Sequence, residues 1–119
     1  MNYSYKKLNV YTKARALVIA TYRLIDKFPK HEMYALSDQL RRSIVSVPSN
    51  VAEGLSRISN KEESRFLDIA YGSLMEAQCQ LEIAVDLGYI TEEELSEVSL
   101  MIDEEATILA GMRKNLKTE

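Results

Sequence analysis

Apolar residues recur every three or four positions through four long stretches of this chain, and no other sequence feature limits the possible folds as strongly. Such spacing places the apolar side chains on one face of an α-helix. It predicts helices over about residues 10–27, 32–54, 60–87 and 91–116. Short connections make long amphipathic helices antiparallel to their sequence neighbours. The predicted fold is therefore all-α: one antiparallel up-down-up-down four-helix bundle domain covering residues 1–119.

Polar residues mark the predicted helix starts. Asn9 is a candidate N-cap of the first helix, because its side chain can accept a hydrogen bond from a free backbone amide. Ser59 and Glu62 have the spacing of a capping box, and so do Thr91 and Glu94. These pairs place the starts of the third and fourth helices.

Glycine and proline mark the other helix features. Gly54 and Gly88 are predicted to end the second and third helices. Pro48 interrupts no apolar repeat, so we expect a proline-kinked second helix rather than two separate helices. The third helix is predicted to turn one face to the core, made of Phe66, Ala70, Ser73, Ala77, Leu81 and Ala84.

Composition agrees with an all-α domain and indicates a cellular compartment. The chain has 119 residues with four Gly and two Pro, too few turn-forming residues for an all-β fold. Its one cysteine, Cys79, cannot form an intramolecular disulfide, which favours a reducing compartment. No stretch approaches the roughly 20 apolar residues of a membrane span. We therefore expect a cytoplasmic protein without membrane association.

Catalytic and metal-binding patterns are missing from the sequence. Di-iron bundles use Glu-x-x-His motifs, but the single histidine, His31, follows Pro29 in a predicted loop. Cys79 has no histidine near it in sequence, and no glycine-rich phosphate loop is present. We expect no enzymatic activity, no cofactor and no metal.

A polar stripe runs beside the apolar face of the second predicted helix and faces similar residues of the third. We interpret it as a hydrogen-bonded polar seam that fixes helix register; a ligand pocket is the alternative. The predicted seam consists of Gln39, Ser43, Ser46, Asn50, Glu53, Ser73, Glu76 and Gln80.

Apolar residues also lie away from the core faces of the second and third helices. Because they cluster on adjacent turns, we predict an oligomer interface there rather than isolated surface residues. The predicted interface consists of Val45, Pro48, Ala52, Tyr71, Met75 and Cys79.

Charge is unevenly distributed along the chain. Residues 1–65 hold 12 Lys and Arg and 6 Asp and Glu, whereas residues 66–119 hold 3 and 12. The basic half can attract either the acidic half or a polyanion such as RNA or DNA. The candidate nucleic-acid contacts are Arg41, Arg42, Arg57, Lys61 and Arg65.

The central sequence resembles a known family. Residues 40–54 read LRRSIVSVPSNVAEG and residues 66–76 read FLDIAYGSLME. These motifs are similar to those of the four-helix-bundle family encoded in intervening sequences of bacterial large-subunit ribosomal RNA genes, some members of which carry a ribosomal-protein label. The matching positions are Arg42, Ser46, Pro48, Ser49, Asn50, Glu53, Gly54, Gly72, Ser73 and Glu76.

The resemblance implies a four-helix bundle that often assembles as a homopentamer, with no known catalytic residues. A related family, the accessory variability determinant of diversity-generating retroelements, implies nucleic-acid binding and a reverse-transcriptase partner. That relative is strongly basic, whereas this chain has a net charge of −3 and a sequence pI near 5.3.

Two functional hypotheses follow. The first is a homo-oligomer, with a pentamer favoured, that binds nucleic acid non-specifically or scaffolds a nucleoprotein. The second is a protein–protein interaction adaptor that does not bind nucleic acid and uses the outer apolar flank or the acidic fourth helix.

Overall fold

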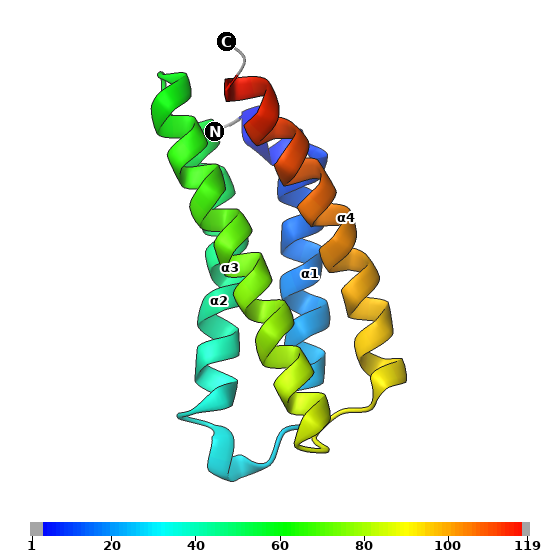
Figure 1. The fold of residues 1–119 in the computed structure, drawn as a ribbon. Coiled ribbons are helices and arrows are strands. Elements are labelled where there is room, and N and C mark those ends of the chain that lie inside the picture. The colour runs from blue at the N-terminus through cyan, green and yellow to red at the C-terminus, as the bar shows by residue number, and fades with distance from the viewer. Residues whose placement is uncertain (1–3, 118–119) are drawn as a thin grey trace.

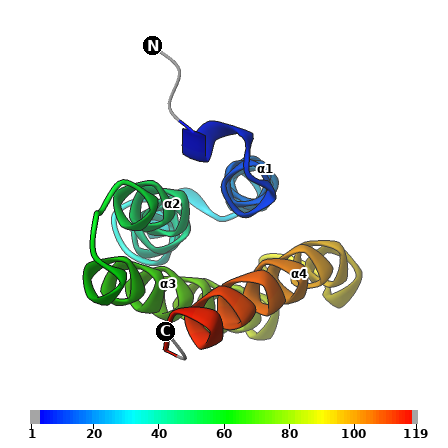
Figure 2. The same ribbon diagram turned by 90° about the horizontal axis from the view of Figure 1, so that it is seen from above.

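A computed structural model of the chain describes residues 4–117 and shows four long helices packed side by side (Figure 1). They are α1 (Asn9–Ile25), α2 (Leu36–Leu55), α3 (Asn60–Asp86) and α4 (Glu92–Lys117), with short 3-10 helices η1 (Ser4–Lys7) and η2 (Lys30–Glu32). Each long helix contacts the next, and α1 also contacts α4, so the four surround a common core (Figure 2). The predicted all-α four-helix bundle is confirmed.

The direction of the helices decides which sequence segments meet. The start of α1, the α2–α3 turn and the end of α4 lie at one end of the bundle (Figure 1). The η2 segment and the α3–α4 turn lie at the other end. Within residues 4–117, no helix is both long enough and apolar enough to cross a membrane.

Each helix contributes an apolar stripe to the core. The side chains of Leu17, Leu40, Ile44 and Leu81 are fully buried there, as the spacing predicts. The core of α3 departs from the prediction, because Leu67 and Leu74 are fully buried.

Phe66 and Ser73, predicted as core residues of α3, are only half-buried. They lie on the flank of α3 that faces α2, where Ser73 contacts Ser46. The leucines one position later, Leu67 and Leu74, turn toward the centre of the bundle instead.

Several helix ends follow the predicted chemistry. The backbone amide of Thr91 donates to Glu94 Oε1 at 2.9 Å, and the amide of Glu94 donates to Thr91 Oγ1 at 3.1 Å. Ser59 Oγ accepts from the amide of Glu62 at 3.2 Å. Gly88 has a φ of +79°, and the amides of Gly88 and Tyr89 donate to carbonyls of the last turn of α3.

Two predicted helix starts were wrong. Asn9 is the first residue of α1, and the cap position is held by Leu8, whose side chain makes no capping hydrogen bond. The second helix begins at Leu36 rather than Glu32, because residues 30–32 form η2; Glu32 Oε1 instead accepts from the Leu36 amide at 3.3 Å.

Gly54 lies within the last turn of α2 and has no positive φ. Its role is close packing, because a Cβ atom there would lie 3.1 Å from Phe66 Cβ and 3.2 Å from the Glu63 carbonyl oxygen. Pro48 lies inside α2, which continues without interruption from Leu36 to Leu55. The kink expected at Pro48 stays a prediction.

Candidate functional site

Two groups of hydrogen bonds join α2 to α3. In the half of the helices nearer η2, buried Ser43 donates from Oγ to Oε1 of Gln80 at 2.8 Å. One turn further along α2, the hydroxyls of Ser46 and Ser73 lie 2.8 Å apart, and Asn50 Nδ2 donates to Ser46 Oγ at 2.8 Å. The structure therefore brings five of the eight predicted seam residues into contact across or along the helices.

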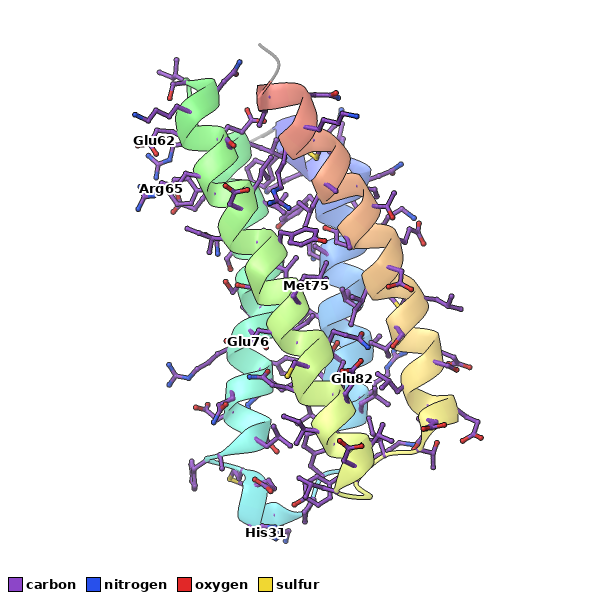
Figure 3. The ribbon with its side chains drawn as sticks, viewed as in Figure 1. His31, Glu62, Arg65, Met75, Glu76 and Glu82 are labelled. Atoms are coloured by element: carbon purple, nitrogen blue, oxygen red, sulfur yellow. The ribbon has the colours of Figure 1, made fainter. Side chains whose placement is uncertain are left out.

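The other three predicted seam residues do not belong to this network. Gln39, Glu53 and Glu76 are exposed. Glu53 accepts from Arg57 at 2.6 Å, and Glu76 projects from α3 into solvent (Figure 3). Their predicted place in a buried seam was wrong. The polar residues extend further around the surface of α2 than the part of it that α3 buries.

The five candidate cations form two groups instead of one patch. Arg41 and Arg42 lie in the second turn of α2, whereas Arg57, Lys61 and Arg65 surround the α2–α3 turn at the opposite end. At 1.5 Å per residue, α2 alone separates the groups by roughly 20 Å. The five residues therefore do not form one compact patch, and their contact with nucleic acid stays a prediction.

Most of these cations contact acidic neighbours. Arg42 Nε lies 2.9 Å from Asp38, Arg57 lies 2.6 Å from Glu53, and Arg65 lies 3.6 Å from Glu62. Exposed pairs of this kind contribute about 0–1 kcal/mol each, so a phosphate can replace the carboxylate at low energetic cost.

The guanidinium groups of Arg57 and Arg65 lie 4.8 Å and 5.5 Å from the ring centre of Phe66. The half-buried ring thus orders both cations beside the α2–α3 turn. Arg65 and Glu62 are both visible at this turn in Figure 3.

Antiparallel packing sorts the charges by end of the bundle. The segments that form the end carrying the α2–α3 turn, residues 4–17, 47–72 and 105–117, hold ten Lys and Arg and five Asp and Glu. The segments of the opposite end, residues 18–46 and 73–104, hold five and twelve. We call the first region the basic end.

The six predicted interface residues lie on two helices, and two of them have different neighbouring elements. Ala52 lines a shallow hollow with Tyr5, on the α1 side of α2. Tyr71 lies on the α4 side of α3, where the Arg113 guanidinium is 4.4 Å from its ring centre. Ala52 therefore lies near η1 and Tyr71 near α4. The oligomer interface itself stays a prediction.

The predicted interface residues on both helices reach the surface. On α2, Val45 is 39% exposed, and Pro48 and Ala52 are half-buried. On α3, Met75 is 38% exposed and Cys79 is exposed as a free thiol.

A buried acid that the sequence prediction did not identify lies in α4. Glu105 is fully buried, and neither carboxyl oxygen has a hydrogen-bond partner in the described part of the chain. The pKa of Glu105 is raised to about 8, chiefly by burial; the charge of nearby Lys13 lowers it and that of Glu104 raises it by smaller amounts. Glu105 continues the spacing of Ile102 and Leu109, so its position in the stripe was a detectable signal.

A polar contact joins η2 to the α3–α4 turn at the end of the bundle opposite the basic end. The hydroxyl of Tyr89 donates to Glu32 at 2.6 Å, and His31 Nε2 lies 3.3 Å from the same hydroxyl. The hydrogen bond lowers the pKa of Glu32 and raises that of Tyr89. His31 is therefore part of a contact between the two loops of this end.

Among residues 4–117, no group of three His, Cys, Asp or Glu side chains is arranged to hold a metal ion. The arrangement of the described side chains instead offers hydrogen bonds inside the bundle and charge on its surface.

Fold and surface together define a small all-α four-helix-bundle protein. The family model described as 23S rRNA-intervening sequence protein matches residues 6–111, and the chain belongs to this family. The family predicted from the sequence motifs is thereby confirmed.

A solved structure shows the same fold. It is described as a protein with unknown function from the S23 ribosomal protein family from Bacteroides thetaiotaomicron. This chain is similar to it with a TM-score of 0.82 and 23% sequence identity, over 88% of this chain and 98% of that one. No curated protein matches the sequence.

Proposed function

We propose that this chain is a non-enzymatic, homo-oligomeric helical bundle that binds nucleic acid non-specifically through its basic end. The observation that carries the proposal is the sorting of charge by antiparallel packing, which gathers ten Lys and Arg into the segments of one end. A chain with a net charge of −3 can thus present a positively charged surface to phosphates.

The contacts would be electrostatic. Lys and Arg bind phosphates and release condensed counterions, and this needs no base-reading motif. Three contacts, from Arg57, Lys61 and Arg65, would give a log–log salt slope of roughly −2 per subunit on single strands. A homo-oligomer would repeat the basic end and strengthen binding by multivalency.

Exposed apolar side chains support self-association. Ile19 is 55% exposed on α1, and Val45 is 39% exposed on α2. Burying such residues against another copy would remove apolar surface from water.

The two groups of cations allow a matched test. The double variant Arg57→Glu and Arg65→Glu changes the basic end, and Arg41→Glu with Arg42→Glu makes the same charge change at the other end. Binding of a labelled mixed-sequence RNA at low salt is measured by fluorescence anisotropy, and light scattering checks the oligomer.

We expect the first variant to lose most RNA affinity and the second to retain most of it. Equal losses in the two variants, or no RNA binding by the unmodified protein, would overturn the proposal.

A second candidate function is a protein-binding adaptor. It is favoured by residues 73–104, which hold nine Asp and Glu and no Lys or Arg. Such a surface repels nucleic acid but attracts a cationic protein segment.

A further inference from the structure

A groove runs along the outside of the bundle between the second half of α3 and the first half of α4. It encloses about 680 Å³, and all of its lining residues fall between Gln78 and Asp103. Ser99 Oγ donates to Gln78 Oε1 at 3.3 Å where the two helices meet. The groove is therefore built on two packed helices.

The polar edges of the groove are acidic. Glu82, Asp86, Glu92 and Asp103 line it, and no Lys or Arg does so. Across residues 4–117, none of these four carboxylates forms an ion pair. In the described part of the chain, their one side-chain hydrogen bond comes from the neutral amide of Gln78, which donates to Glu82 at 3.0 Å. Figure 3 shows Glu82 on the part of α3 that faces α4.

Two acidic residues just outside the groove, unlike those that line it, form ion pairs. Glu94 pairs with Lys27 of α1, and Glu104 pairs with Lys13 of the same helix. Cations of α1 thus pair with acids on the flank of α4 that faces α1, while the acids of the groove have no ion pair within residues 4–117.

The surface of the groove is apolar between the acids. Leu95 is buried beneath it, Val85 is half-buried, and Leu100 is 71% exposed at its edge. A partner that covers this surface binds most tightly if it has both apolar and cationic side chains.

We propose that this groove docks a basic amphipathic segment of a partner protein. Its Lys and Arg side chains lie against the four groove carboxylates, and its apolar side chains cover Val85 and Leu100. The chemistry fits a helix laid along two helices, since one helical face can carry apolar residues flanked by cations. The groove would be the binding site of the protein-binding adaptor, the second candidate function given above. The proposal does not depend on nucleic-acid binding at the basic end.

A separate partner fits better than a second copy of this chain. Many of its own cations already contact its own acids: Lys13, Lys27, Arg42, Arg57, Arg65 and Arg113 all do so. A second copy that offered one of these six cations would first have to give up its intramolecular pair, whereas a lysine-rich segment brings uncompensated charge.

The test uses three synthetic 18-residue peptides: one amphipathic helix of Lys and Leu, one with each Leu replaced by Ser, and one with each Lys replaced by Glu. The protein variants are Glu82→Gln with Asp103→Asn, and Leu100→Ser. The matched control is Glu76→Gln with Glu97→Gln, which removes two charges from the same acidic stretch outside the groove. Binding is measured by anisotropy of the labelled peptides, with RNA binding and light scattering in parallel.

We expect the Lys and Leu peptide to bind, the other two peptides to bind at least tenfold more weakly, and each groove variant to lose about tenfold. The control should change affinity less than threefold, and RNA binding by the groove variants should stay unchanged. Equal losses in the control would show general charge attraction and overturn the proposal. So would dissociation of a homo-oligomer by Leu100→Ser, which would make a second copy the occupant.

Discussion

Replacing Glu105 with leucine should stabilise the bundle at neutral pH. The carboxyl group is fully buried without a hydrogen-bond partner, and burial raises its pKa from 4.5 to about 8. In the unfolded chain the group ionises near 4.5, so folding above that pH requires it to take up a proton. The stability contributed by Glu105 is therefore highest below pH 4.5 and is lost as the pH rises to about 8.

The size of the effect follows from the two pKa values. Each pH unit between them costs about 1.4 kcal/mol, which gives roughly 3 kcal/mol at pH 7 and a plateau above pH 8. Leucine has no proton to take up and adds apolar contacts to the core. Glu105→Leu should thus raise the free energy of unfolding by about 3 kcal/mol at pH 7, and by much less at pH 4.5.

Urea unfolding at pH 4.5, 6, 7 and 8 measures this difference directly. Glu104→Leu is the control, because Glu104 is exposed next to Glu105 and pairs with Lys13. The reasoning is refuted if Glu105→Leu and the unmodified protein show the same pH dependence, or if leucine destabilises the protein at pH 7.

Four smaller substitutions test the local packing, each by urea unfolding at pH 6. Gly88→Ala should cost about 1 kcal/mol because φ is +79° there, and an unchanged midpoint would contradict that reason. Gly54→Ala should cost about 1–3 kcal/mol, since its Cβ would lie 3.1 Å from Phe66 Cβ; a neutral effect would show that α2 and α3 can separate freely. Ser46→Ala should cost about 1 kcal/mol by removing the link between Ser73 and Asn50, whereas exposed Ser49→Ala should cost much less; equal effects would remove the seam from the account. Thr91→Ala should cost about 1 kcal/mol through the lost cap of α4, and no loss would make the capping box dispensable.

The number, order and direction of the helices could be predicted from the sequence because one strong signal, the apolar spacing, determines them. The cap at Thr91 and the glycine end at Gly88 were predictable for the same reason: each depends on a few adjacent residues. The start of α2 was not, because the backbone between Lys30 and Ala35 turns through η2 before the helix begins.

Features that depend on how helices approach one another were harder to predict. The exact rotation of α3 places Leu74 rather than Ser73 at the centre, and this follows from its close contact with α2. The two groups of cations share a sequence region but lie at opposite ends, because α2 runs the length of the bundle between them. The basic end, in contrast, could have been predicted. Counting charged residues separately for the two ends of the predicted antiparallel bundle, rather than for the two halves of the chain, is enough to identify it.

The most direct test of the account is light scattering coupled to size exclusion, carried out with and without a mixed-sequence RNA at low and moderate salt. The account predicts a homo-oligomer that shifts with RNA at low salt, releases it at moderate salt, and no longer shifts after Arg57→Glu with Arg65→Glu. A stable monomer, or an oligomer that ignores RNA at every salt concentration, would contradict it.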